Sequence, residues 1–320
     1  HPIPKPSAID GELDPRRVRA VIVSILREAA KEGDTFLSQT ELIERISKAN
    51  LSHPCDISSD WLNGNISQFE GVVERFALPL SGTSKSVDGN SLQVLQLSEL
   101  KQQEDYLRKI INARAKKSVP STKADWETLI VETIKKRGLT FDANNKRHVE
   151  ALQDQATALE KVTTHRLSIL TGKAGTGKTS ALGTLFLCQP IVKSGILLLA
   201  PTGKARVRLG RAALSEAKTV AQFLSERGRW NGTINQPLYN GKDPYGIEKT
   251  VVIDECSMLT MQDLYAVLLA LDLGHVQRII LVGDPNQLPP IGTGRPFADI
   301  CASFENAQSS IDPEIQKLAE

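Results

Sequence analysis

The hydrophobic and polar positions of the first 100 residues predict several short helices followed by a strand. Apolar residues recur at helical spacing from about Asp14, again from about Ser38, and a third time over 60–76. Turn residues follow over 81–90, and residues 92–97 then alternate between apolar and polar as a half-buried strand does. This order predicts a small, mainly helical, winged-helix-like module. Such a module either binds DNA or serves as a spacer or a protein-interaction surface.

Between residues 165 and 300 the pattern changes to apolar strands that alternate with helices. Strands are predicted at 167–171, 195–200, 250–253 and 278–282, and helices at 178–187, 203–214 and 260–272. Alternation of this kind predicts an α/β fold with a parallel sheet covered by helices on both faces. In such folds the functional loops gather at the C-terminal ends of the strands.

Composition divides the chain into four predicted segments. Residues 1–13 are a Pro-rich extended lead-in, 14–118 the N-terminal module, 119–148 a linker with one helix, and 149–320 the α/β domain. Within the last segment, glycines and three aromatic residues over about 228–249 predict a small hairpin insertion.

Charge and cysteine content exclude several classes of protein. The formal net charge is only +2, and the sequence has no signal peptide and no apolar run of membrane-spanning length. Four widely spaced cysteines without a CxxC pair argue against a zinc site or a disulfide framework and suit the reducing cytoplasm. Local charge is more informative. Residues 101–148 carry 12 Lys/Arg against 6 Asp/Glu, and residues 203–229 carry 7 against 2. Each excess is either a solvated helix face or a surface for a polyanion.

Residues 172–179 have the GxxxxGK[ST] pattern of a phosphate-binding loop, between a predicted strand and a predicted helix. Glycines let successive backbone N–H groups point into one concavity, and the helix N-terminus adds its positive dipole. Lys178 can reach the β- and γ-phosphates, and the Thr179 hydroxyl can hold Mg²⁺. The residues assigned to the nucleotide here are Gly172, Gly175, Thr176, Gly177, Lys178, Thr179 and Ser180.

Two further strands end in polar residues at the same predicted sheet edge. The strand at 250–253 ends in Asp254, which can hold Mg²⁺ through water, and Glu255, which can activate an attacking water as general base. A plain capping pair before the next helix is the alternative reading of these carboxylates. The strand at 278–282 leads to Gln287, an uncharged donor and acceptor able to sense the γ-phosphate.

A second anion site is predicted where the strand at 195–200 meets the next helix. Its residues are Pro201, Thr202, Gly203 and Lys204. Backbone N–H groups at a helix start, with a threonine and a lysine, suit a DNA phosphate. Arg206, Arg208 and Arg211 follow on the helix, and their spacing spreads them around it, so that not all can face one strand.

The order of these motifs resembles the first motor domain of a superfamily 1B DNA helicase of the RecD-like group. The motifs are GKAGTGKT, LAPTGKA, VVIDECSM and GDPNQLPPIGTG, and the likeness is strong over about 150–300 and loose before it. The resemblance implies a RecA-like P-loop domain in which Lys178, Thr179, Asp254, Glu255 and Gln287 serve ATP hydrolysis. QATAL at 155–159 is similar to the QxxAL segment of that family, so Gln155 is expected to contact the adenine. The residues expected to grip single-stranded DNA are Pro201, Thr202, Gly203, Lys204 and Thr219.

The resemblance also implies partners and a direction. It implies 5′ to 3′ movement on single-stranded DNA or at a junction of single- and double-stranded DNA, a second RecA-like domain with an arginine finger, and a protein partner for the N-terminal module. The chain begins at His1 and ends about 30 residues after Pro290. We therefore expect a fragment that binds ATP and Mg²⁺ but hydrolyses ATP weakly by itself.

Two features depart from the family pattern or stay ambiguous. Val220 follows Thr219 where the family has a TIH-type block, and the missing histidine removes one expected DNA contact. In the family a hairpin that splits the duplex emerges near residues 228–249, which gives Trp230 a possible DNA contact by stacking. A flexible loop with packed aromatic residues is the alternative.

Two other functions compete with the helicase. The parent protein is alternatively a nucleotide-gated scaffold, with the P-loop domain as a switch, or a P-loop kinase of metabolism. The kinase is disfavoured because the PTGKA and GDPNQLPP segments have no part in it.

Overall fold

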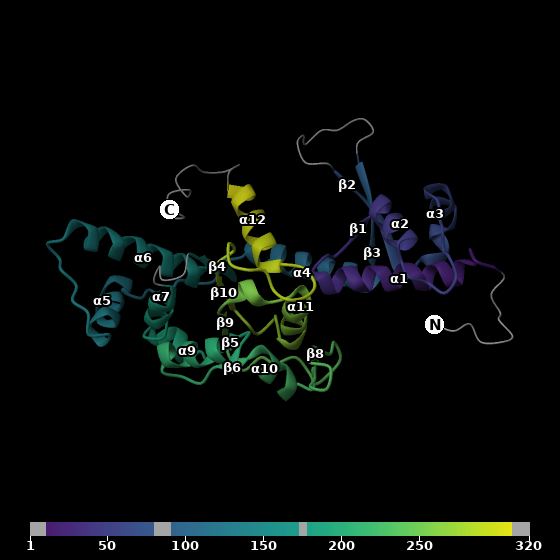
Figure 1. Cartoon of the computed structure of the whole chain (residues 1–320). Coiled ribbons are helices and arrows are strands. Elements are labelled where there is room, and N and C mark those ends of the chain that lie inside the picture. Colours follow the sequence, from purple (N-terminus) through teal and green to yellow (C-terminus); the bar gives the residue numbers. More distant parts are fainter. Residues whose placement is uncertain (1–10, 80–90, 173–177, 309–320) are drawn as a thin grey trace. The chain divides into compact units, whose positions relative to one another are not determined.

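The computed structural model describes residues 11–79, 91–172 and 178–308, which divide into two compact units. The first unit comprises the chain up to Tyr106 together with Ile291–Gly294. The second comprises Leu107–Pro290 and the residues from Arg295 onward. Figure 1 labels the elements of both units.

The first unit combines helices with a three-stranded antiparallel sheet, and its winged-helix-like character stays a prediction. Its elements are α1 (Pro15–Glu32), β1 (Leu37–Ser38), α2 (Gln39–Ser47), α3 (Ser59–Asn65), the 3-10 helix η1 (Ile66–Phe69), β2 (Val73–Pro79), β3 (Ser91–Leu97) and the start of α4 (Ser98–Ala115). The strands form an antiparallel sheet in the order β1-β3-β2. Ile22, Leu42, Leu62 and Phe69 are fully buried, so the helices pack over one apolar core.

The prediction of one helix over 60–76 is wrong. The helix ends at Asn65, η1 follows, and Val73–Pro79 is a strand paired with β3. Gly71 has a φ of 80°, a conformation that glycine adopts without strain and that ends the helical run. The apolar residues at 69, 72, 73 and 76 fit helical spacing, but pairing with β3 overrides that local pattern.

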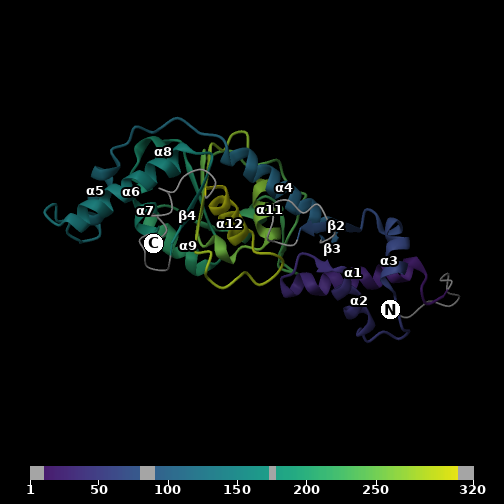
Figure 2. The ribbon, with the colours of Figure 1, turned by 90° about the horizontal axis from the view of Figure 1, so that it is seen from above.

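The second unit is an α/β domain built on a five-stranded parallel sheet, which confirms the predicted fold class. Its elements are the rest of α4, α5 (Trp126–Lys136), α6 (Lys146–Thr164), β4 (Leu167–Thr171), α7 (Lys178–Leu185), α8 (Gln189–Lys193), β5 (Ile196–Ala200), α9 (Gly203–Ala213), β6 (Lys218–Thr219), α10 (Val220–Glu226), β7 (Trp230–Asn231), β8 (Gln236–Pro237), β9 (Thr250–Ile253), the 3-10 helix η2 (Cys256–Met258), α11 (Met261–Ala270), β10 (Arg278–Gly283) and α12 (Pro296–Gln308). The strand order is β4-β10-β9-β5-β6. Helices lie on both sides of the sheet (Figures 1 and 2).

The register brings the C-terminal ends of the strands to one edge. Gly283 of β10 lies opposite Thr171 of β4, and Leu281 lies opposite Ile253 of β9. On the other side of β9, β5 pairs in parallel with β9 and β6. Every residue of β9 and β10 is buried, as expected for a sheet covered on both faces. Four loops therefore leave the sheet from the same edge.

A buried arginine ties the end of α4 to the sheet domain. The guanidinium of Arg114, on a residue that is only 6% exposed, donates to the carbonyl oxygens of Arg166 (3.2 and 3.3 Å), Leu273 (3.0 Å) and Val276 (2.9 Å). Burial lowers the pKa of Arg114 to about 10, and the nearby Arg166 acts in the same direction. One side chain thus joins the chain before β4 to the chain before β10.

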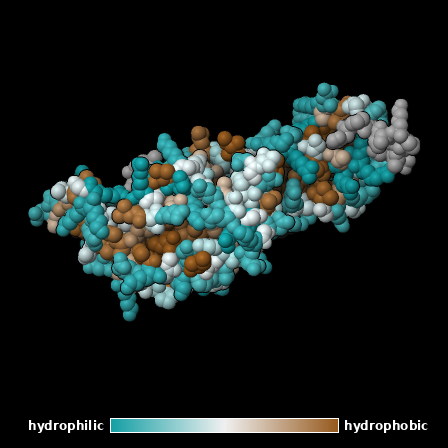
Figure 3. All heavy atoms as spheres, turned by 90° about the horizontal axis from the view of Figure 1, so that it is seen from below, coloured by the Kyte–Doolittle hydropathy of each residue, from teal (hydrophilic) through white to brown (hydrophobic). Residues whose placement is uncertain are grey.

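No helix in the described part of the chain combines the length and the apolar character needed to cross a membrane. On the face shown in Figure 3, hydrophobic residues gather in patches among hydrophilic ones.

Candidate functional site

The phosphate-loop motif lies between β4 and α7, as predicted. Gly172 follows β4 and Lys178 begins α7, and the Lys178 ammonium donates to the carbonyl oxygen of Gly172. This contact holds the lysine side chain back over the start of the loop. The predicted nucleotide residues Gly175, Thr176 and Gly177 lie outside the described residues.

Asp254 and Glu255 follow β9 at the same edge, between the loops after β10 and β5. Asp254 is 3% exposed, and its carboxylate accepts the backbone N–H of Glu255 at 2.9 Å. Burial raises the pKa of Asp254, while that N–H and the guanidinium of Arg208 oppose the rise. Asp254 is therefore a carboxylate removed from solvent, at the C-terminal edge of the sheet, with oxygens that can bind a metal ion.

Glu255 has a left-handed backbone conformation, with φ of 53° and ψ of 41°. A non-glycine residue in this region costs of the order of 1 kcal/mol or more, and such strain gathers at functional sites. The conformation turns the chain sharply from β9 into η2 and leaves the glutamate at the sheet edge. Asp254 and Glu255 are not a simple helix cap, because the next helix, α11, is capped by Thr260. The strained backbone at Glu255 therefore needs another explanation.

Arg208 of α9 contacts both carboxylates, an arrangement that the sequence did not predict. Its Nη2 lies 3.3 Å from Oδ2 of Asp254 and also donates to Oε1 of Glu255. The hydrogen bond to Glu255 is the main reason that the pKa of Arg208 is raised. The sequence held one signal for this contact. Lys204 and Arg208 are four residues apart and therefore lie on the same face of the helix.

The loop after β10 presents Gln287 at the same edge. The buried carboxylate of Asp284 accepts the backbone N–H of Asn286 at 3.0 Å, and the N–H of Gln287 donates to the Asp284 carbonyl at 3.1 Å. These bonds close a turn that leaves Gln287 half-buried. The turn chemistry explains why an aspartate follows Gly283.

Two threonines cap helices after neighbouring strands β5 and β6. Thr202 precedes α9 and accepts the N–H of Ala205 at 3.2 Å, and Thr219 precedes α10 and accepts the N–H of Gln222 at 3.1 Å. A hydroxyl that accepts a backbone bond still has a hydrogen to donate. Both threonines, with exposed Gly203 and Lys204, can therefore donate to an anion such as a phosphate.

The donor set at the edge fits Mg²⁺ bound mainly through a nucleotide. In the part of the chain that the structure describes, no three His, Cys, Asp or Glu residues gather as a metal cluster. Asp254 and Asp284 each have a buried carboxylate at this edge, after β9 and β10, and the motif assigns the metal ion to Asp254. Mg²⁺ typically takes one or two carboxylates and completes its shell with water and phosphate oxygens. Thr179, whose side chain lies outside the described atoms, is the second protein ligand that the motif predicts.

The sequence profile of the AAA domain family matches residues 150–312 of the 320-residue chain. The chain belongs to the AAA domain family.

Named relatives narrow the type of AAA domain. The chain is 34% identical over 145 residues to the ATP-dependent RecD2 DNA helicase of Deinococcus radiodurans, covering 45% of this chain and 19% of that protein. It is 31% identical over 169 residues to the RecBCD enzyme subunit RecD of Mycolicibacterium smegmatis, covering 46% and 30%. It is 28% identical over 318 residues to the uncharacterized protein MJ1519 of Methanocaldococcus jannaschii, covering 94% and 27%. These relatives confirm the resemblance to RecD-like DNA helicases.

The predicted hairpin insertion of the AAA domain places Trp230 away from the hairpin tip. Trp230 pairs with Pro237 at the base, and residues 232–235 form the turn. Trp230 is partly buried, whereas Ile234 in the turn is 59% exposed. A tip that enters a duplex would thus present Ile234 first, and the DNA contact of Trp230 stays a prediction.

The other aromatic residues of the insertion pack against the AAA domain. Tyr239 makes an edge-to-face contact with Tyr265, with ring centroids 5.1 Å apart. Tyr245 does the same with Phe223 at 5.7 Å. The contacts of Tyr239 and Tyr245 agree with the alternative prediction for this segment, a loop with packed aromatic residues.

Gln155 lies on α6, half-buried and four residues before the core residue Leu159. Ser180 lies in the first turn of α7, and its side chain, like that of Thr179, is outside the described atoms. The nucleotide contacts of these residues therefore stay predictions.

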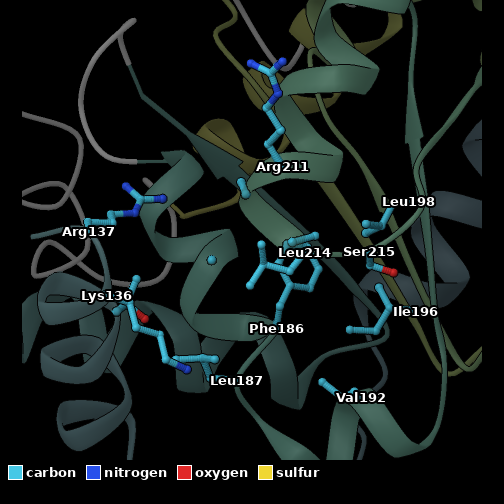
Figure 4. Close-up of a pocket in the computed structure, with 14 residues that line it drawn as sticks. Lys136, Arg137, Phe186, Leu187, Val192, Ile196, Leu198, Arg211, Leu214 and Ser215 are labelled. Carbon is cyan, nitrogen blue, oxygen red and sulfur yellow. The ribbon is translucent and has the colours of Figure 1, made fainter.

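A cavity of about 510 Å³ lies elsewhere in the second unit (Figure 4). It is lined by the C-terminal ends of α5, α7 and α9 and by parts of α8 and β5, and its lining residues include Phe186, Leu214, Arg137 and Arg211. None of the predicted site residues lines it. The cavity is therefore separate from the sheet edge, and Arg211 lies on it.

Replacing Gly283 by Ala is expected to disturb the γ-phosphate side of the site. A Cβ at this position would lie 2.8 Å from Cε1 of Phe297 and 3.2 Å from the backbone nitrogen of Ser257. Overpacking of this kind costs roughly 1–3 kcal/mol and shifts the backbone, so Asp284 and Gln287 should move with it. We expect weaker binding of Mg²⁺ and a non-hydrolysable ATP analogue, measured by calorimetry. Gly232→Ala, where a Cβ meets nothing within 4 Å, is the control. Equal affinities in both variants would contradict the expectation.

Proposed function

We propose that the chain is part of an ATP-dependent DNA helicase or translocase of the RecD-like group. The chain spans 19–30% of the lengths of the three relatives described above, so the activity is proposed for a longer protein that contains it. Movement from 5′ to 3′ along single-stranded DNA, or at a junction with duplex, is part of this proposal.

One observation carries the proposal. The helix start at Thr202–Lys204, suited to a DNA phosphate, and the carboxylates after β9 belong to adjacent strands of one sheet. The sequence separation of Arg208 and Glu255 is 47 residues, and yet the two side chains touch. A P-loop kinase of metabolism gives no part to the PTGKA and GDPNQLPP segments at this edge. A translocase needs such a connection, because it must couple DNA binding to hydrolysis.

Each residue at the edge has a proposed part in ATP hydrolysis. Lys178 neutralises charge on the β- and γ-phosphates, and Gln287 orients the γ-phosphate and the attacking water. Glu255 accepts the proton of that water as it attacks in line. Asp254 and Thr179 would hold Mg²⁺, which when bound neutralises charge that develops between the β- and γ-phosphates.

The proposed partners follow from the same reading. A second RecA-like domain would supply an arginine finger, which in related phosphoryl transfers is worth about 10³–10⁵ in rate. The winged-helix-like module would contact DNA or a protein partner. We place the protein in the cytoplasm, and the four cysteines, all buried and unpaired, support a reducing compartment.

Lys204→Ala tests the DNA contact directly. We expect weaker binding of a 20-nucleotide oligo(dT) to the chain, because each lost phosphate contact removes one released counterion. The slope of log affinity against log salt should fall in magnitude by about 0.7. Fluorescence anisotropy over a salt series measures both quantities.

Lys193→Ala, an exposed lysine on α8, is the matched control and should leave the slope unchanged. If the wild-type chain shows no salt-dependent binding of oligo(dT), or if Lys204→Ala keeps the full slope, the assigned DNA site is wrong. Binding of Mg²⁺ and ATP without any DNA binding would favour the nucleotide-gated scaffold instead.

A further inference from the structure

Arg208 joins the proposed DNA-binding helix to the proposed catalytic carboxylates. Its guanidinium lies at 3.3 Å from Asp254 and also pairs with Glu255, although its side chain is 51% exposed. Asp254, in contrast, has a side chain that is only 5% exposed. The arginine therefore covers a buried carboxylate from the solvent side.

A guanidinium and a divalent cation compete for the same carboxylate. If Asp254 is a ligand of Mg²⁺, directly or through water, a positive charge 3.3 Å from Oδ2 opposes the approach of the metal ion. The hydrogen bond from Arg208 also occupies Oε1 of Glu255 and, through its positive charge, makes this carboxylate a weaker acceptor for a proton from water. In this arrangement the carboxylates are held in an unreactive pairing.

Because Arg208 lies on α9, an anion bound at the start of that helix can compete with the carboxylates for the guanidinium. Lys204 and Arg208 stand four residues apart on α9, where side chains are neighbours with Cβ atoms about 5–6 Å apart. A phosphate bound near Lys204 is an alternative anionic partner for an arginine that is half exposed. The guanidinium fork matches the geometry of a phosphate as well as that of a carboxylate.

We propose that Arg208 is a positioning residue that exchanges between the Asp254–Glu255 pair and a DNA phosphate. Single-stranded DNA at the start of α9 draws the guanidinium away, and the carboxylates become available to Mg²⁺ and water. By linkage, Mg²⁺–nucleotide and DNA each strengthen the binding of the other by the same factor. This inference rests on the proposed function and adds the residue that couples its two ligands.

The test measures coupling rather than hydrolysis. The affinity of the chain for a fluorescent, non-hydrolysable ATP analogue is measured with Mg²⁺ or EDTA, with and without saturating 20-nucleotide oligo(dT). In the wild type, oligo(dT) is expected to tighten Mg²⁺–nucleotide binding by about 5-fold or more, within the usual range of allosteric coupling. In Arg208→Ala the DNA-free affinity should rise by the same factor and the effect of oligo(dT) should vanish. Both changes should require Mg²⁺.

Two variants show whether the guanidinium itself matters. Arg211→Ala removes the same charge from the same helix, but Arg211 lies on the separate cavity, so coupling should be unchanged. Arg208→Lys keeps the charge without the planar group that spans two carboxylates, and should restore only part of the coupling. Thermal unfolding of each variant checks that the fold is intact.

The outcomes distinguish a failure of the proposed role of Arg208 from a failure of the proposed function. If the wild type binds both ligands and Arg208→Ala keeps the coupling, the role of Arg208 is overturned and the proposed function stands. If wild type and Arg208→Ala both show no coupling, the exchange is likewise overturned. If the wild type binds neither ligand, the proposed function fails first and the inference falls with it.

Discussion

Replacing Glu255 by Gln is expected to slow ATP hydrolysis by about 10²–10⁴-fold, the usual contribution of a general base. Glutamine keeps the size of the side chain but cannot accept a proton from water. Lys178 and the phosphate loop are untouched, so binding of Mg²⁺ and ATP should persist. Steady-state hydrolysis is measured in the longer protein with saturating single-stranded DNA, and nucleotide affinity by titration.

A matched carboxylate gives the control. Glu132 lies on α5, where it pairs with Lys136 on the surface, so Glu132→Gln should retain the wild-type rate. Should Glu255→Gln hydrolyse ATP at the wild-type rate, Glu255 is not the general base, and the left-handed backbone at this residue needs another explanation.

Replacing Arg114 by Ala is expected to destabilise the second unit by roughly 3–5 kcal/mol. The guanidinium donates to three carbonyl oxygens, those of Arg166, Leu273 and Val276. Each buried acceptor left without a donor costs about 1–3 kcal/mol. The change also leaves a hole beside the starts of β4 and β10. Urea unfolding followed by circular dichroism measures the loss.

The effect should belong to the buried guanidinium and not to α4 in general. Lys109→Ala changes an exposed cation on the same helix and should alter the free energy of unfolding by less than about 0.5 kcal/mol. An equally small loss for Arg114→Ala would mean that water replaces the guanidinium at all three carbonyls. That result would remove Arg114 as the tie between these loops.

Much of the fold was predictable because local and global signals agree in the second half of the chain. The apolar runs that became β4, β9 and β10 are bounded by glycine or by charged residues, and the helices between them carry their own caps at Thr202, Thr219 and Thr260. The strands of a parallel sheet that is buried on both faces are continuous apolar runs in the sequence. In the first unit the signal was weaker, and β2 was misread because its apolar spacing also fits a helix.

The site was predictable only in part. Motif spacing placed Lys178, Asp254, Glu255 and Gln287 after separate strands, and the parallel order then required those loops to share one edge. Whether Trp230 or Ile234 stands at the exposed end of the hairpin depends on the strand register, which two short strands do not fix by composition.

The order of the motifs, the alternation of strands and helices, and the resemblance to RecD-like helicases could all be derived from the sequence alone. The strand order, with β10 between β4 and β9, and the contact of Arg208 with Asp254 and Glu255 became visible only in the folded chain. The reason is physical. Local patterns specify which face of each element is buried. A contact between residues 46 or 47 positions apart also depends on which strands become neighbours and on how far a helix extends past the sheet edge.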